Sequence, residues 1–289
     1  MALGLWATLA WLTTETARLP PFQLMALAFA VPFALTVFTW GFRRESVRAH
    51  LALPPRVWAL GLFGIFGYHA LFFVALRRAP AAEANLINYL WPLLLALGSS
   101  MLPGERLKWW HLAGCALGFS GAALVASGGG AFDFRSQAFP GYGAALACAF
   151  IWPVYSILSR RFAKVSTDAV GAFCGGTAAL SLLLHLGFER WVAPAMLEWL
   201  CVAGMGLGPL GLALFCWDEG MKQGNVRALA AVSYFQPLLS TLVLIAFGKG
   251  QLSGTLGVAC LLIVAGAATG GFDAVRPTSS SGGGRRWPL

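Results

Sequence analysis

The sequence predicts an all-α integral membrane protein with about ten transmembrane helices, arranged as two inverted five-helix repeats around a central cavity. Of its 289 residues, 58% are hydrophobic and only 11% are charged, and the mean hydropathy is +0.72. This composition is too apolar for a soluble globular domain. Apolar runs of bilayer-crossing length follow one another with short polar links. A weak internal repeat, described below, predicts the two halves.

The apolar runs are separated by Gly and Pro, for example at Pro54-Pro55 and Gly128-Gly129-Gly130. Residues 1–14 lack a basic n-region and a cleavage site, so we expect a first transmembrane helix and not a signal peptide. The other nine predicted helices cover approximately 22–41, 57–76, 81–102, 109–127, 141–159, 169–187, 196–217, 226–247 and 253–272. The predicted repeats are 1–130 and 138–273, followed by a disordered tail, 274–289.

The distribution of Lys and Arg predicts the orientation in the membrane. If both termini lie on one side, that side carries 14 of the 20 Lys and Arg residues and the other side carries six. The positive-inside rule then places both termini in the cytoplasm of a bacterial cell, with the protein in its inner membrane. The net charge of +9 is explained by these segment ends, so we expect no nucleic-acid partner.

Six cysteines fall inside apolar runs without a CxxC or Cys/His cluster. Small buried side chains explain them better than disulfides or a metal site. We therefore expect no metal and no cofactor.

Polar groups interrupt the fourth apolar run. Asn85, Asn88, Tyr89 and Pro92 share one face at helical spacing, with Trp91 beside it. Lipid offers no hydrogen-bond partners for two amides and a phenol, so this face is expected to contact protein or a water-filled cavity.

The same pattern returns 145 residues later. Tyr89, Pro92, Leu93 and Leu94 correspond to Tyr234, Pro237, Leu238 and Leu239, and Trp11 is paired with Trp152 as a further counterpart. Five helices per repeat is an odd number, so the halves must have opposite orientation. Inverted repeats with matching prolines and polar groups favour a secondary transporter whose site lies near the midplane.

Several motifs carry a family resemblance. They are Asn88-Tyr89-Leu90-Trp91-Pro92, Ala149-Phe150-Ile151-Trp152, Trp217, Gly224-Asn225-Val226 and Ser233-Tyr234-Phe235-x-Pro237. With these residues the chain resembles the drug/metabolite transporter superfamily, in its EamA-like branch, and within that branch the aromatic amino acid exporters. The resemblance implies a central cavity braced by helices 5 and 10, and export of aromatic amino acids, with threonine and methionine as further neutral cargo. It departs from some relatives at Tyr68-His69, where they place an acidic residue after the tyrosine.

The candidate site consists of polar and aromatic residues on the helices expected to face the cavity. The substrate-binding candidates are Tyr68, His69, Asn85, Asn88, Tyr89, Trp91, Trp152, Tyr155, Trp217, Tyr234 and Gln236, and the hinge candidates are Pro92 and Pro237. Trp91 and Tyr89 either stack on the cargo or fill space between helices. The two asparagines either bind the charged end of the cargo or join helices through amide hydrogen bonds.

Two groups bear on ion coupling. His69 either carries a proton or lines the cavity in its neutral form, and the second is favoured because its helix has no acid spaced with it. Asp218 and Glu219 are interpreted as solvated residues at the membrane interface.

Small residues also bear on assembly. Gly114, Gly118 and Gly121 in helix 5, with Gly266 and Gly270 in helix 10, allow close approach to a neighbour. Contacts within one chain are favoured, so we expect a monomer surrounded by lipid, with a dimer through helices 5 and 10 as the alternative.

Two other functions compete with amino acid export. Export of a drug-like or other small metabolite fits the same fold, although few interior Lys or Arg residues argue against phosphorylated cargo. An intramembrane lipid-modifying enzyme needs clustered His, Asp, Glu or Ser. The four histidines and eleven acids are scattered and lie mostly at helix ends, which argues against an enzyme.

Overall fold

The computed structural model describes residues 1–102, 108–249 and 251–270, and within them every regular element is a helix. Seven helical segments are long and apolar enough to cross a membrane, and Gly254–Gly270 is a shorter apolar helix. The predicted all-α membrane architecture is confirmed, while the predicted tail, 274–289, lies outside the described residues. The seven segments are Pro21–Phe42, Pro55–Arg78, Trp109–Ser127, Ser136–Phe162, Ala169–Phe188, Met196–Gln223 and Val226–Ala246.

The helices follow the predicted apolar runs closely. The first half contains α1 (Ala2–Glu15), α2 (Pro21–Phe42), α3 (Val47–Leu51), α4 (Pro55–Leu62), α5 (Tyr68–Arg78), α6 (Ala81–Asn88), α7 (Trp91–Ser99) and α8 (Trp109–Ser127). The second half contains α9 (Phe139–Ser159), α10 (Ala169–Phe188), α11 (Met196–Leu207), α12 (Ala213–Gln223), α13 (Val226–Ser233), α14 (Phe235–Ala246) and α15 (Gly254–Gly270). The short helix α3 was not expected.

Two of the predicted runs contain a stretch of π-helix. The segment η1 (Phe63–Gly67) joins α4 to α5, and η4 (Gly208–Leu212) joins α11 to α12. A π-turn inserts an extra residue and changes the hydrogen-bond partners of the backbone locally, and such turns often lie at functional sites. Both helical segments therefore change their backbone pattern in the middle.

Two other predicted runs are broken outright. Helix α6 ends at Asn88 and α7 begins at Trp91, while α13 ends at Ser233 and α14 begins at Phe235. Pro92 and Pro237 thus lie in the first turn of the second helix, where a proline's missing N–H has no intrahelical partner to lose.

Element bounds recur at the spacing of the sequence repeat. A shift of 145 residues carries η1 onto η4, α5 onto α12 and α6 onto α13, with both ends matching in each case. The interruptions in the two halves therefore occupy equivalent positions.

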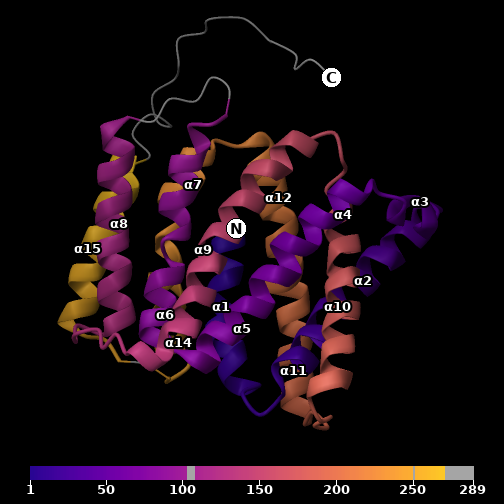
Figure 1. The fold of residues 1–289 in the computed structure, drawn as a ribbon, viewed down its shortest axis with the longest axis horizontal. Helices are drawn as coiled ribbons and strands as arrows, with labels where there is room; N and C mark the ends of the chain where they lie inside the picture. The colour runs from indigo at the N-terminus through magenta and orange to yellow at the C-terminus, as the bar shows by residue number, and fades with distance from the viewer. Residues whose placement is uncertain (103–107, 250, 271–289) are drawn as a thin grey trace, which may run out of the picture.

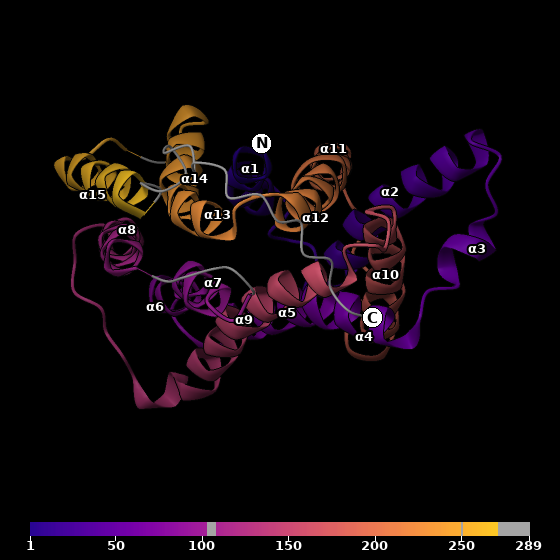
Figure 2. The same cartoon turned by 90° about the horizontal axis from the view of Figure 1, so that it is seen from above.

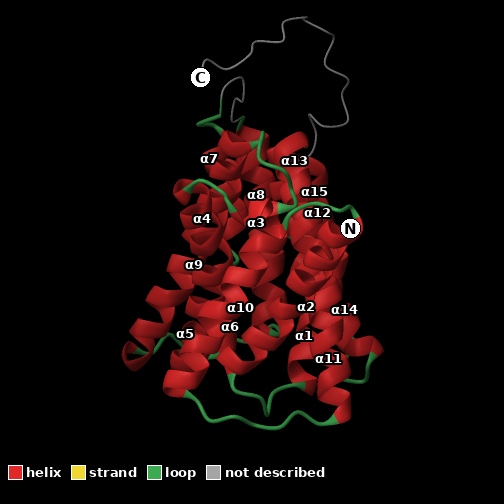
Figure 3. Ribbon diagram, turned by 90° about the vertical axis from the view of Figure 1, so that its right-hand side faces the viewer, coloured by secondary structure: helices red, strands yellow, loops and turns green. Residues whose placement is uncertain are grey.

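The elements form a bundle whose loops gather at two ends (Figure 3). Helices α8 and α15 lie side by side at one edge, α2 and α10 lie toward the other, and α9 runs between them beside α5 (Figures 1 and 2). The start of α1 lies nearer the upper end of Figure 1, and its link to α2 lies at the lower end. The interrupted helices thus occupy the space between the two edges.

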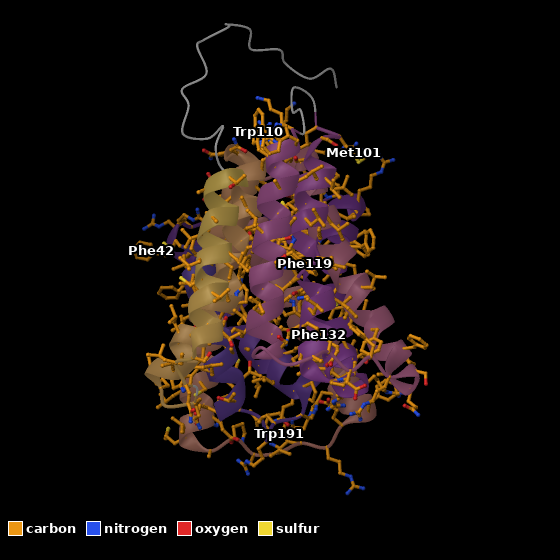
Figure 4. All side chains as sticks on the ribbon, turned by 90° about the vertical axis from the view of Figure 1, so that its left-hand side faces the viewer. Phe42, Met101, Trp110, Phe119, Phe132 and Trp191 are labelled. Atoms are coloured by element: carbon orange, nitrogen blue, oxygen red, sulfur yellow. The ribbon has the colours of Figure 1, made fainter. Side chains whose placement is uncertain are left out.

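Glycines hold α8 and α15 together, and we call Gly114, Gly118, Gly121, Gly266 and Gly270 the glycine seam. A methyl group on Gly114 would lie 2.6 Å from the Gly266 carbonyl oxygen, and one on Gly266 would lie 2.6 Å from the Gly118 nitrogen. Figure 4 shows the two helices adjacent along their length. The glycine faces of these helices are therefore covered within one chain, by each other and, at Gly118, by the Tyr234 ring.

Ion pairs and hydrogen bonds close the lower end of the bundle. Arg18 pairs with Glu198 at 2.6 Å, and this hydrogen bond raises the pKa of the Arg18 guanidinium above its usual value. The Gln23 side chain donates to the Val192 carbonyl at 2.6 Å and accepts from the Val192 N–H at 2.9 Å. These contacts attach the start of α2 and the link before it to the first turn of α11 and to the segment that joins α10 to α11.

Candidate functional site: a buried aromatic cluster

Six aromatic residues from five helices meet in the interior, and we call them the aromatic cluster. Its members are Trp6 of α1, Tyr68 of α5, Trp91 of α7, Trp152 and Tyr155 of α9, and Trp217 of α12. At its centre three indoles contact one another, with ring centroids 5.6 Å apart for Trp6 and Trp152, 5.3 Å for Trp6 and Trp217, and 5.9 Å for Trp152 and Trp217. These distances lie in the favourable range for aromatic pairs.

The other members surround this centre. Trp91 meets Trp217 edge-on at 5.7 Å, while Tyr68 and Tyr155 each lie 5.5 Å from Trp152. Trp91, Trp152, Tyr155 and Trp217 are all buried. The cluster thus joins helices from both halves of the chain.

Two of the indole N–H groups have defined acceptors. Trp217 Nε1 donates to Ser156 Oγ at 3.0 Å, and Trp6 Nε1 donates to the Pro209 carbonyl at 2.9 Å. Pro209 belongs to η4, so one member of the cluster binds directly to a π segment. A change in that segment's backbone therefore alters a contact of the cluster.

Asn88 places an amide beside the cluster. Its Nδ2 donates to the Tyr68 hydroxyl at 3.1 Å. Its Oδ1 is buried and has no hydrogen-bond partner among the described residues. A buried carbonyl oxygen without a donor costs free energy, so this atom is a ready acceptor for a ligand N–H.

His69 lies next to Tyr68, with the two ring centroids 5.2 Å apart. Its Nδ1 donates to the Ile65 carbonyl at 2.7 Å, and Ile65 belongs to η1. The ring also meets Phe29 of α2 edge-on at 5.1 Å. Among the described residues, no carboxylate contacts this imidazole.

The structure brings seven of the eleven predicted substrate-binding residues together through these contacts. Asn85, Tyr89, Tyr234 and Gln236 form no described hydrogen bond or aromatic ring contact with the cluster, although Tyr89 and Tyr234 belong to the same apolar core. Tyr234 is fully buried, and its ring lies against Gly118 of α8. Gln236 donates only to Ser240 of its own helix, at 3.4 Å, and its buried Oε1 has no partner among the described residues.

Trp6 and Ser156 belong to the site but were not predicted from the sequence. A shift of 145 residues places Trp152 opposite residue 7, directly after Trp6, and this signal was available. The sequence analysis pairs Trp152 with Trp11, which stacks on Phe247 with ring centroids 4.0 Å apart and lies outside the cluster.

The interpretation of Asp218 as a solvated interfacial residue is wrong. Asp218 is 4% exposed and forms a 2.6 Å ion pair with Lys222, one helical turn later in α12. Its neighbour Glu219 is exposed, as expected. The sequence spacing of four between an acid and a lysine on one helix signals this pairing.

One group of described residues brings three possible metal ligands together, outside the aromatic cluster. These are Glu45, His50 and Asp168, near the end of α2. Arg43 pairs with Asp168 at 2.7 Å and with Glu45 at 3.4 Å. The guanidinium therefore already supplies the positive charge that these carboxylates need.

A bundle with seven helical segments of membrane length around a buried aromatic and amide cluster fits the architecture of a membrane transporter. The chain belongs to the EamA-like transporter family, which matches residues 1–127 and 139–269. It is a multi-pass membrane protein of a transporter family and not an enzyme.

Individual relatives agree with this assignment. The chain is 49% identical to the aromatic amino acid exporter YddG of Ancylobacter novellus over 92% of this chain and 93% of the relative. It is 25% identical to the aromatic amino acid exporter YddG of Escherichia coli, over 92% of each chain. A crystal structure of a protein with 47% identity superposes with a TM-score of 0.88, over 95% of this chain and 96% of that one.

Proposed function

We propose that this protein exports aromatic amino acids from the cytoplasm by alternating access, and that threonine and methionine are further cargo. The observation that carries the proposal is the contact between the aromatic cluster and Asn88. An aromatic amino acid needs ring faces for its side chain and polar partners for its charged end. The cluster offers the first, and the unpaired Asn88 Oδ1 offers an acceptor for the ammonium group. The names of the relatives support the same cargo.

The transport mechanism rests on the two halves of the chain. We propose ten membrane crossings in two inverted five-helix repeats around the cluster. The matching bounds of η1 with η4, α5 with α12 and α6 with α13 support this arrangement, as do the two separate family matches. In such folds the halves rock against each other around a central site.

We further propose that both termini face the cytoplasm and that the protein lies in a bacterial inner membrane. The support is the excess of Lys and Arg on the side of the termini. The covered glycine seam favours a monomer.

The breaks before Pro92 and Pro237 and the two π segments are the proposed hinges. At each of these positions the regular hydrogen-bond pattern is interrupted, so the backbone dihedral angles can change without breaking a continuous helix. The contacts of Trp6 with η4 and of His69 with η1 link the site to these hinges.

A transport assay tests the proposal. The purified protein in liposomes is expected to exchange radiolabelled phenylalanine for unlabelled tryptophan, tyrosine and phenylalanine in counterflow. Trp91→Ala is expected to lower the apparent affinity for an aromatic amino acid by about threefold to tenfold, because it loses one stacking partner. Its effect on threonine should be smaller.

Two controls accompany this assay. Trp199→Ala removes an indole that is 44% exposed on α11 and should leave the ratio of phenylalanine to threonine transport unchanged. Trp91→Leu keeps most of the apolar volume and guards against a folding defect, which size-exclusion chromatography detects. Equal weakening of phenylalanine and threonine in both Trp91 variants would show that the cluster only supports the fold.

A further inference from the structure

A small cavity lies beyond Tyr155, at the end of the bundle where the link 163–168 joins α9 to α10. Its volume of about 20 Å³ holds a single water molecule. The cavity lies between α4, α9, α10 and α12, and Tyr155 belongs both to its wall and to the aromatic cluster. Its lining includes Tyr155, Phe162, Val165, Phe173, Asp218 and Lys222.

The polar wall of this cavity is the ion pair between Asp218 and Lys222, which we call the loading pair. Lys222 Nζ lies 2.6 Å from Asp218 Oδ2, and the two side chains are 9% and 5% exposed. Lys222 also donates to the Val165 carbonyl at 2.9 Å, and Thr167 Oγ1 donates to Asp218 at 2.8 Å. The link before α10 is thus held to α12 by both charges.

A buried ion pair is costly, because both charges lose their hydration. Well-packed apolar side chains would close this end of the bundle at least as well. The pair instead presents one carboxylate and one ammonium, about one helical turn apart in sequence, beside the aromatic wall formed by Tyr155, Phe162 and Phe173. An α-amino acid carries the complementary charges and an adjacent side chain.

We propose that the loading pair is a first binding site for zwitterionic amino acids, on the way to the aromatic cluster; this inference rests on the proposed function. The cargo's ammonium replaces Lys222 at the Asp218 carboxylate, and the cargo's carboxylate replaces Asp218 at the Lys222 ammonium. Each buried charge keeps a partner throughout the exchange. The separation of the pair also releases the contacts with Val165 and Thr167 and widens the cavity toward Tyr155.

A nearby hydrogen bond, from Arg160 to the Gly224 carbonyl, serves as a control for the loading pair. Arg160, at the end of α9, donates to the Gly224 carbonyl at 3.3 Å and ties the same end of α9 to the link after α12. It closes the end without presenting a charge pair to cargo. Arg160→Gln should therefore change the transport of all cargo by one common factor.

The test uses three competitors in phenylalanine counterflow with the full chain in liposomes. Phenylalanine carries both charges, phenethylamine lacks the carboxylate, and 3-phenylpropionate lacks the ammonium. Lys222→Gln should weaken competition by phenylalanine about tenfold and competition by phenethylamine much less, because only the first needs Lys222. Asp218→Asn should also weaken competition by phenylalanine about tenfold, but it should weaken competition by 3-phenylpropionate much less, because 3-phenylpropionate has no ammonium group to bind Asp218. Glu219→Gln, on the exposed neighbour, should change neither ratio.

A charge-swapped variant distinguishes a loss of binding from a folding defect. The double substitution Asp218→Lys with Lys222→Asp keeps an ion pair at the same spacing, so the protein should elute as a single folded species. Its affinity for phenylalanine should still fall about tenfold, because the cargo's charges then meet the pair in reversed order beside the aromatic wall. Unchanged affinity in the swapped variant, or an equal loss for all three competitors in both single variants, would overturn the loading site.

The outcomes separate the two proposals. If the unmodified protein exchanges phenylalanine but the competitor ratios do not move, the export function stands and the loading site is wrong. If the unmodified protein exchanges no aromatic amino acid, the proposed function fails, and the loading site fails with it.

Discussion

The pair α8 and α15 differs from the helices around the aromatic cluster in almost every physical respect. Both are continuous helices of 19 and 17 residues, and glycines bring their backbones into direct contact. Three of the helices that supply the cluster adjoin an interruption: α5 follows η1, α12 follows η4 and α7 follows the break after Asn88, whereas α1 and α9 are continuous. Large aromatic side chains fill the space between them.

This difference indicates that the α8–α15 pair is a rigid brace and that the helices around the aromatic cluster can move. Backbone atoms in contact leave no side chain that can rotate away, so the glycine seam has one arrangement. Aromatic rings can change rotamer, and interrupted helices can change direction at the interruption. The comparison predicts that motion is concentrated around the cluster while the seam stays fixed.

The largest expected effect comes from a methyl group in the seam. Gly114→Ala would place Cβ 2.6 Å from the Gly266 oxygen and from the Gly270 Cα, and both of these are backbone atoms. The helices must separate, which should destabilise the protein by about 1–3 kcal/mol. Thermal unfolding in detergent measures this loss.

The matched control is Gly257→Ala in α15, where an added methyl group meets no heavy atom within 4 Å. This change should leave the unfolding temperature unchanged or raise it slightly, since alanine restricts the unfolded chain. If both variants unfold at the same temperature, the seam can separate easily and its role as a brace is wrong.

A smaller effect is expected for a hydrogen bond inside the cluster. Trp217→Phe removes the donor to Ser156 Oγ and keeps most of the ring volume. The hydrogen bond should account for about 1 kcal/mol of the loss, the usual net value of one intramolecular hydrogen bond, and the smaller ring adds the cost of a cavity. Ser156→Ala and the double variant complete a cycle, and the coupling energy between the two positions measures the bond itself. A coupling energy near zero would show that the two side chains do not depend on each other.

The sequence predicted much of this fold because apolar periodicity and Gly or Pro punctuation report the limits of membrane helices. The run 109–127 agrees with α8 at both ends. The breaks before Pro92 and Pro237 coincide with the two prolines that sequence analysis selected. The π segments were not predicted, because one extra residue in a uniformly apolar helix leaves the hydropathy pattern unchanged.

The site was harder to predict, because its geometry depends on contacts between distant segments. Tyr68 and Trp152 were selected individually, and only the fold brings their rings to 5.5 Å. Trp6 was not predicted because the short first run contains two tryptophans, Trp6 and Trp11, and only the 145-residue spacing distinguishes them. The burial of Asp218 was not predicted, because its position near a helix end indicates a solvated carboxylate. Lys222, one helical turn later, indicates the ion pair instead.

The smallest expected effect concerns His69, at the junction of the cluster with η1. Its Nδ1 donates to the Ile65 carbonyl, and its ring is held between Phe29 and Tyr68. Since no acid among the described residues contacts this ring, it has no partner to stabilise a charged form or to receive a proton. We therefore predict that a pH gradient is not required and that His69 lines the site in its neutral form.

Counterflow of phenylalanine with the same pH on both sides of the liposome membrane checks this. Flux should persist in the unmodified protein, and His69→Gln should change it by no more than about twofold, because a side-chain amide can still donate a hydrogen bond near Ile65. Tyr68→Phe is the matched comparison in the same turn of α5: it removes the hydroxyl that accepts from Asn88 and should weaken phenylalanine binding more than His69→Gln does. Loss of all flux at equal pH, or loss in a folded His69→Gln variant alone, would instead assign proton transfer to this histidine and make η1 part of the coupling mechanism.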